Sequence, residues 1–157
     1  MFKKIFSAAF LIGALQLGAA AQVGPGYTNA LGIRTEFGSG GATFGFSGKH
    51  FFSAHDAGEA QLLFGSGVTD LALEYQYHAP IGGAEGLQWY LGFGTAVRFA
   101  SSTTWFYVRP IGGLDYKLGT APINLSFDWR PTILLSNAYG GSRFTAGRFG
   151  LAARYAF

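Results

Sequence analysis

The chain offers few residues that could act as nucleophile and base. A hydrolase or acyltransferase places a histidine beside a serine and orients it with an acid. The histidines are His50, His55 and His78, and the candidate serines are Ser101, Ser102, Ser136 and Ser142. None of these serines is close in sequence to a histidine, and the histidines lack the tight spacing of metal ligands. We therefore predict no catalytic residue, no metal site and no cofactor.

The charged residues favour a different chemistry, the pairing of opposite charges on one face of a strand. Arg34 lies two positions from Glu36, and Asp128 lies two positions from Arg130. Every separation between charges within one extended segment is even, so each segment carries its charges on a single face. The set predicted to share an interior comprises Arg34, Glu36, Lys49, Glu59, Asp70, Glu74, Arg98, Arg109, Asp115, Lys117, Asp128, Arg130, Arg148 and Arg154.

The segments that carry these charges have a period of two, which is the spacing of a β-strand with two different faces. Eight such runs are separated by clusters of Gly, Pro, Asn, Asp or Ser. They cover Asn29–Phe37, Thr43–Phe52, Ala60–Gly65, Asp70–His78, Leu87–Ala100, Trp105–Gly119, Ile123–Leu135 and Phe144–Phe157. The face opposite the charges carries bulky apolar and aromatic residues, such as Leu125, Phe127 and Trp129 in the seventh run.

Two closed all-β architectures fit eight alternating strands. A soluble barrel of the lipocalin type has an apolar interior and a polar exterior, whereas a membrane barrel reverses the two faces. Bulky aromatics suit the roomy outside, and small or charged groups suit a narrow inside. A Lys or Arg facing lipid would also cost about 2–4 kcal/mol at the midplane. We therefore predict an all-β fold, an eight-stranded antiparallel up-and-down transmembrane β-barrel.

The N-terminus has the pattern of a secretory signal peptide. "MFKK" is followed by the apolar run "IFSAAFLIGALQLG" and the small residues "AAAQ". This order predicts a signal peptide over residues 1–21, cleaved between Ala21 and Gln22, and a barrel over residues 22–157. The alternative is a membrane anchor helix, for which the apolar run is short.

Cleavage changes the charge balance. Loss of Lys3 and Lys4 lowers the basic residues from 11 to 9, against 8 acidic ones. No run of basic residues remains, so the sequence indicates no nucleic-acid partner. There is no Cys, and hence no disulfide or thiolate metal site.

The last segment, "RFGLAARYAF", carries Phe149, Leu151, Tyr155 and Phe157 on one face and ends on the aromatic. It resembles the C-terminal strand of bacterial outer-membrane barrels, and the whole mature chain resembles the small barrels of the OmpX and OmpA size class. The resemblance implies the bacterial outer membrane as location, outer-membrane lipid as surroundings, and recognition of the last strand by the barrel-assembly machinery. Ala153 is smaller than the residue usual in that pattern.

The resemblance leaves function open, because that size class includes adhesins, anchors, small pores and lipid-modifying enzymes. We expect a charge-filled lumen and a structural or surface-interaction role, through loops such as "SNAYGGSR" with Tyr139 and Arg143 and a surface ligand that is unknown. The alternatives are a narrow pore for ions or small solutes and a lipid-modifying enzyme. The predicted topology places all three histidines at the periplasmic ends of strands, away from outer-leaflet lipid.

Two Arg-Pro dipeptides, Arg109-Pro110 and Arg130-Pro131, lie within predicted strands. Proline lacks an N–H and is disfavoured inside a sheet. A turn at "TAP" would make the numbers of opposed residues sum to about 241–243, which brings the prolines within a rung or two of each other. We predict a bulge or a weakened ladder there, on the lipid side.

Overall fold

The computed structural model describes residues 26–135 and 143–157. This part of the chain forms ten strands: β1 (Asn29–Gly38), β2 (Thr43–Phe51), β3 (Asp56–Gly65), β4 (Val68–Pro80), β5 (Leu87–Phe99), β6 (Thr104–Lys117), β7 (Ile123–Trp129), β8 (Thr132–Leu134), β9 (Phe144–Thr145) and β10 (Arg148–Ala156). The predicted signal peptide and its cleavage site lie outside the described residues. No helix within those residues is long and apolar enough to cross a membrane.

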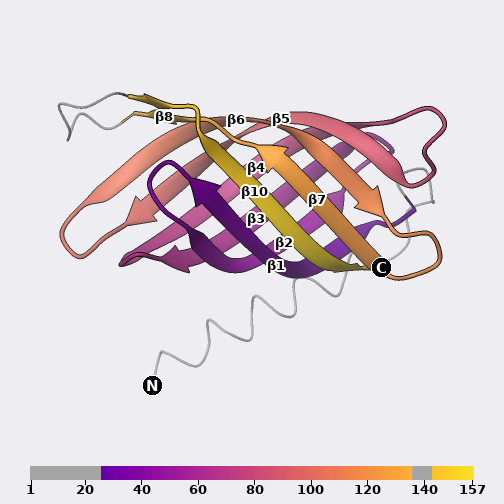
Figure 1. Cartoon of the computed structure of the whole chain (residues 1–157), viewed down its shortest axis with the longest axis horizontal. Coiled ribbons are helices and arrows are strands. Elements are labelled where there is room, and N and C mark those ends of the chain that lie inside the picture. The colour runs from indigo at the N-terminus through magenta and orange to yellow at the C-terminus, as the bar shows by residue number, and fades with distance from the viewer. Residues whose placement is uncertain (1–25, 136–142) are drawn as a thin grey trace, which may run out of the picture.

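The strands close into a barrel in which each strand is antiparallel to its neighbours (Figure 1). β1 pairs with β2 on one side and with β10 on the other, and β5 pairs with both β4 and β6. β7 and β8 follow each other in one strand position of the barrel, and β9 and β10 follow each other in the next; we call each strand position a wall. The barrel therefore has eight walls and is eight-stranded, and the predicted all-β, up-and-down antiparallel barrel is confirmed.

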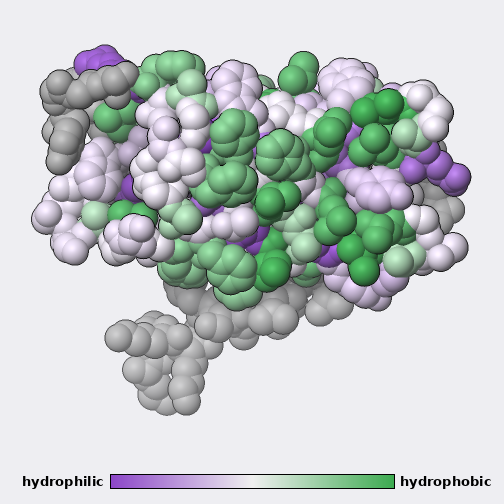
Figure 2. Space-filling model, in the orientation of Figure 1, coloured by the Kyte–Doolittle hydropathy of each residue, from purple (hydrophilic) through white to green (hydrophobic). Residues whose placement is uncertain are grey.

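The two faces of the wall differ as the alternation requires. The outer face carries large apolar side chains, among which Leu73 is 63% exposed and Phe93 is 62% exposed. Figure 2 shows such side chains gathered over the barrel wall. The inner face carries the charged residues, and Glu36 and Arg34 are 0% and 1% exposed. The barrel is thus apolar outside and charged inside, the reverse of a lipocalin.

The connections divide between two ends of the barrel. The terminus end holds Tyr27, the C-terminal Phe157 and the turns at 52–55, 81–86 and 118–122, and the far end holds the turns at 39–42, 66–67 and 100–103. In Figure 1 the C-terminus lies at the same end as the turn between β6 and β7.

The third strand begins at Asp56, earlier than the predicted Ala60. "DAGE" has the composition of a turn, but it extends the ladder with β2, where Glu59 lies opposite Lys49. Gly58 lies on the outer face under the ring of Phe52, where a Cβ atom would lie 2.9 Å from that ring and would push it aside. Packing of an aromatic ring over a glycine backbone is invisible to local turn statistics.

The ladder between β6 and the β7–β8 wall is interrupted at two opposed prolines. Opposed residue numbers sum to 241 on both sides of the gap, so Pro110 lies directly across from Pro131. Leu135 donates its N–H to Phe106 at 2.8 Å, and because alternate antiparallel pairs exchange hydrogen bonds, Pro110–Pro131 is also such a pair. Neither proline has an N–H, so both bonds of this pair are absent.

The unbonded stretch runs from the pair Gly112–Trp129 to the pair Val108–Ile133. Four residues of a strand span roughly 14 Å. We call this stretch the proline seam. The prolines remove the two donors and leave two carbonyls without ladder partners, with no change of register. Pro110 is exposed on the outer face, whereas Pro131 is buried.

A bulge lies on the other side of the same wall. Trp129 opposes Phe149, but Thr132 opposes Thr145, so the two residues Arg130 and Pro131 face the three residues 146–148. One extra residue on one strand defines a β-bulge. Of the two predicted alternatives, the weakened ladder is present between the two prolines, and the register there is unbroken. The bulge lies on the other side of the same segment, where none was predicted.

Restoring one donor in the proline seam should stabilise the barrel. Pro131→Ala supplies an N–H opposite the carbonyl of Pro110, and we expect the free energy of unfolding to rise by about 0.5–1.5 kcal/mol, the net value of one hydrogen bond. Urea titration in lipid vesicles, followed by tryptophan fluorescence, measures the change. Pro80→Ala is the control, because Pro80 ends β4 and its partner across the ladder is Gln88 rather than a second proline. An unchanged or lower stability for Pro131→Ala would contradict the seam.

Candidate functional site

The interior is organised around the carboxylate of Asp128 on β7. Asp128 accepts hydrogen bonds from Nη2 of Arg34 and from the hydroxyl of Tyr90, each at 2.6 Å, and from Nε of Arg130. Gly150 of β10 makes room for this cluster, because a Cβ there would lie 2.2 Å from Nη2 of Arg34 and 2.6 Å from Asp128. Four walls of the barrel therefore contribute to one buried charge cluster.

Two glutamates extend the cluster toward the far end. Nη1 of Arg130 lies 2.8 Å from Glu36 and 2.8 Å from Glu74. Arg109 of β6 binds the same two glutamates, at 3.1 and 2.8 Å, and Arg148 of β10 lies 3.2 Å from Glu36. Each carboxylate is thus shared by at least two arginines, which is how buried charges are compensated.

A second group of charges lies nearer the terminus end. Glu59 binds Arg34 at 3.2 Å and also Nη2 of Arg154. Nζ of Lys49 lies 2.8 Å from Asp115 and 3.7 Å from Glu59. Glu59 therefore joins the two groups into one continuous network.

The structure brings together all but one of the residues predicted to share the interior. The residues that form ion pairs are Arg34, Glu36, Lys49, Glu59, Asp70, Glu74, Arg98, Arg109, Asp115, Asp128, Arg130, Arg148 and Arg154. Lys117 differs, because its Nζ donates to the carbonyls of Leu118, Gly119 and Ala121. It is the last residue of β6, where the wall gives way to a turn, and it secures that turn.

Aromatic rings close the interior at the terminus end. Tyr27 meets Phe51 edge to face with centroids 5.2 Å apart, Phe51 meets His78 at 4.8 Å, and His78 stacks on Tyr90 at 4.8 Å. Nζ of Lys49 lies 4.8 Å from the Tyr90 ring centre. All four rings are buried. We call these four rings the aromatic layer; it lies beside the charge network, which it meets through the hydroxyl of Tyr27 on Asp115 and that of Tyr90 on Asp128.

Neutral polar residues complete the network, and sequence reasoning did not single them out. Nε2 of Gln61 donates to Glu59 and Glu74, each at 2.9 Å, and Gln76 donates to Glu59 at 3.0 Å. Asn124 donates to Asp115 at 2.6 Å. Each of these residues shares the inward parity of a charged residue two or more positions away. That parity is the signal that identifies them.

The chain was compared with protein families, curated proteins and solved structures. No protein-family model matches the chain, and no curated protein matches it. Among solved structures, the crystal structure of Neisserial surface protein A is similar, with a TM-score of 0.48 and 16% sequence identity, covering 83% of this chain and 96% of that one. A likeness of this degree says nothing about which residues act or what they act on.

The histidines lie at the terminus end, as expected. Nδ1 of His50 lies 2.8 Å from Asn29, and Nδ1 of His55 lies 2.8 Å from the carbonyl of His78. Ser53 stands near His55, but its hydroxyl accepts the backbone N–H of His55 and donates to Asp56. This contact is turn chemistry rather than a nucleophile activated by an imidazole. Ser101 and Ser102 lie at the far end, and Ser136 and Ser142 lie outside the described residues.

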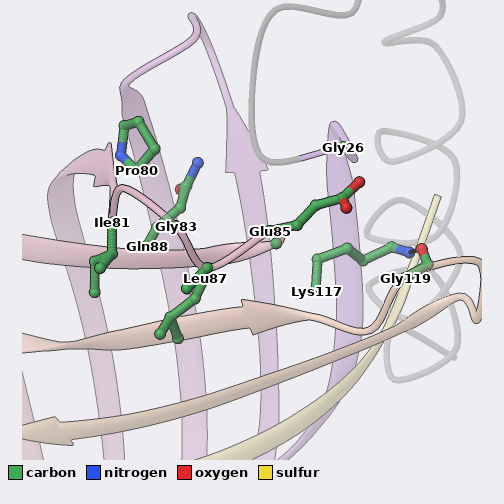
Figure 3. Close-up of a pocket in the computed structure, with 11 residues that line it drawn as sticks. Gly26, Pro80, Ile81, Gly83, Glu85, Leu87, Gln88, Lys117 and Gly119 are labelled. Atoms are coloured by element: carbon green, nitrogen blue, oxygen red, sulfur yellow. Dashed lines mark hydrogen bonds between the residues drawn. The ribbon is translucent and has the colours of Figure 1, made fainter.

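The terminus end also has a broad hollow of about 640 Å³ between the 81–86 turn and the end of β6 (Figure 3). Its lining includes Gly26, Pro80, Ile81, Glu85 and Lys117. In Figure 3 the side chain of Lys117 runs toward Gly119, whose carbonyl it binds at 3.1 Å. The ammonium group is therefore already occupied by the turn.

The far end holds a smaller cavity of about 160 Å³ that opens between strands from several walls. We call it the mouth cavity; it is lined by Ser39, Gly40, Asp70, Ala96, Arg98, Tyr107, Arg109, Thr132, Thr145 and Arg148. Arg98 forms a two-fold contact with Asp70, Nε to Oδ1 and Nη2 to Oδ2, both at 2.6 Å. Three interior arginines, Arg98, Arg109 and Arg148, thus border the open space of the mouth cavity.

Proposed function

We propose that the chain is an integral protein of the bacterial outer membrane with a structural or surface-interaction role and a lumen that does not conduct. The observation that carries this proposal is the filled interior. Arg34, Tyr90 and Arg130 are each at most 1% exposed, and they lie in the middle of a network that joins most walls of the barrel. Seven cations and six anions nearly neutralise each other, so the network holds the walls together without creating a strong field.

The apolar exterior supports the membrane location. Many aromatic and aliphatic side chains on the outer face are between 36% and 67% exposed, and a continuous apolar surface of this kind requires lipid or a partner. A closed barrel also satisfies its backbone groups without water, which a membrane-spanning structure needs. The proposal includes export through the predicted signal peptide, cleaved between Ala21 and Gln22.

The last strand supports recognition by the barrel-assembly machinery. Leu151, Tyr155 and Phe157 face outward and are 46%, 60% and 55% exposed. Phe149 is half-buried and stacks on Phe127 with ring centroids 6.1 Å apart. This outward-facing apolar and aromatic set is the feature by which the resemblance implies recognition, and its exposure in the closed barrel supports the proposal.

The pore and enzyme alternatives predict different measurements. In planar bilayers we expect no ion conductance above that of protein-free membranes, because buried charged and aromatic side chains occupy the lumen. Stepwise conductance that changes in Arg130→Met would instead favour a pore. Lipid A extracted from expressing cells should show no mass shift, and a shift would favour an enzyme.

The same preparation tests the fold in its membrane. A closed outer-membrane barrel resists unfolding in cold detergent, so we expect faster gel migration before heating than after it. A protein that fractionates as soluble and shows no such difference would contradict the membrane location independently of conductance.

A further inference from the structure

We propose that the mouth cavity binds a tetrahedral oxyanion such as phosphate, either as a free ion or as part of a lipid headgroup. Phosphate in these two forms is the probe used in the test below. The site goes beyond the structural role proposed above, because a sealed barrel needs no ligand. It involves Arg98, Arg109 and Arg148, which border the same space from β5, β6 and β10.

The charge around the cavity favours an anion. Three arginines line it, against one lining carboxylate, Asp70. Behind them lie Glu36, shared by Arg109, Arg130 and Arg148, and Glu74, shared by Arg109 and Arg130, so neither carboxylate is reserved for one lining arginine. Guanidinium groups present several N–H donors in a rigid fork and suit phosphate oxygens.

Arg109 has one donor that its carboxylate partners do not use. Its Nε is buried and has no hydrogen-bond partner among the described residues. A buried donor without a partner is costly, and because the atom itself is shielded from the cavity, the guanidinium would have to turn for an anion there to accept from it.

The shape of the donor set favours a tetrahedral anion over a planar carboxylate. The hydroxyl residues Tyr107, Thr132 and Thr145 add to the arginines, and together they come from several walls. Donors converging from different sides match four oxygens better than two oxygens in one plane. A volume of about 160 Å³ equals that of roughly five water molecules in the liquid, enough for an ion of five heavy atoms.

The proline seam gives a reason to test a lipid-borne phosphate. Arg109 and Thr132, both in the cavity lining, are opposed across the seam next to Pro110 and Pro131. Beside the cavity, the ladder between β6 and the β7–β8 segment therefore lacks the hydrogen bonds of the Pro110–Pro131 pair, and under the proposed location the membrane lies on the outer side of that gap.

The experiment titrates folded protein, in a non-ionic detergent free of phosphate, with sodium phosphate by calorimetry. A second arm measures binding of the protein to vesicles of phosphatidylcholine with and without a phosphomonoester lipid. We expect saturable binding in at least one arm, weakened roughly tenfold or more in Arg148→Gln, because a charge-assisted hydrogen bond is lost. Saturation with free phosphate identifies a soluble ligand, and enrichment only on phosphomonoester vesicles identifies a lipid; either supports the site.

Lys117→Gln is the matched control, because it removes the same charge at the opposite end of the barrel. It should change the affinity less than twofold. Gel mobility before and after heating tests whether Arg148→Gln is folded. We expect it to fold, because Glu36 keeps Arg109 and Arg130 as partners when Arg148 is replaced. If that variant does not fold, Tyr107→Phe combined with Thr145→Val replaces it and should weaken binding severalfold.

Three outcomes would overturn the proposal. They are no saturable binding in either arm, equal affinities for the wild type and the folded mouth variants, and acetate binding as tightly as phosphate. The last would show that the donors do not select a tetrahedral anion.

Discussion

Arg130→Met is expected to destabilise the barrel by about 3–5 kcal/mol, the cost of removing one partner from a buried ion pair. Arg130 lies 2.8 Å from both Glu36 and Glu74, and its Nε also binds Asp128. Its side chain is fully buried, so water cannot replace it. Methionine keeps much of the volume, and the loss therefore reports charge rather than a cavity.

Urea-induced unfolding in lipid vesicles, read by the fluorescence of the three tryptophans, measures this loss as a lower midpoint with an unchanged slope. Arg98→Met is the matched control. Arg98 makes one ion pair, with Asp70 at the mouth cavity, and keeps 19% of its side chain exposed, so we expect a smaller loss of about 1–3 kcal/mol, the cost of leaving one buried carboxylate without its partner. Equal losses for the two variants would contradict a central role for Arg130.

Phe93→Arg is expected to reduce the free energy of folding into a bilayer by about 2–4 kcal/mol, the cost of an arginine facing lipid near the midplane. Phe93 is the middle residue of β5 and is 62% exposed on the outer face. Its neighbours across the strands are Tyr75 and Pro110. The same substitution on a soluble barrel would place a charge in water at little cost.

Phe99→Arg is the control for depth. Phe99 is the last residue of β5 and is 46% exposed on the same face. Near the interface the cost of an arginine falls to about 0–1 kcal/mol. A difference between the two variants that depends on folding into vesicles would locate the membrane around the centre of β5. Equal, small effects at both positions would contradict a membrane-spanning wall.

The sequence alone determined the alternation of faces, and with it the closed barrel that is apolar outside and charged inside. The reason is physical: side chains of a strand point to opposite faces in turn, so even spacing of charges fixes their common side before any pairing is known. The same logic located the two prolines near each other, because a short turn sets the register of the two strands it joins.

The tertiary structure decided which charges meet. Arg34 and Asp128 are 94 positions apart, and Arg148 and Glu36 are 112 positions apart; such partners depend on closure of the barrel and on the relative shift of all its walls. It also decided the aromatic layer, in which Phe51 and His78 come from different strands, and the extension of β3 under the ring of Phe52.

The two Arg-Pro dipeptides show both kinds of information in one place. The alternation of the strand placed Arg109 and Arg130 inside. The missing N–H groups of Pro110 and Pro131 predicted a weakened hydrogen-bond ladder next to them. Only the structure showed that the prolines are directly opposed at a pair that would exchange two hydrogen bonds, and that Arg109 borders the mouth cavity. Those facts depend on register and on packing across the barrel, because local sequence fixes which face a residue occupies but not what lies across from it.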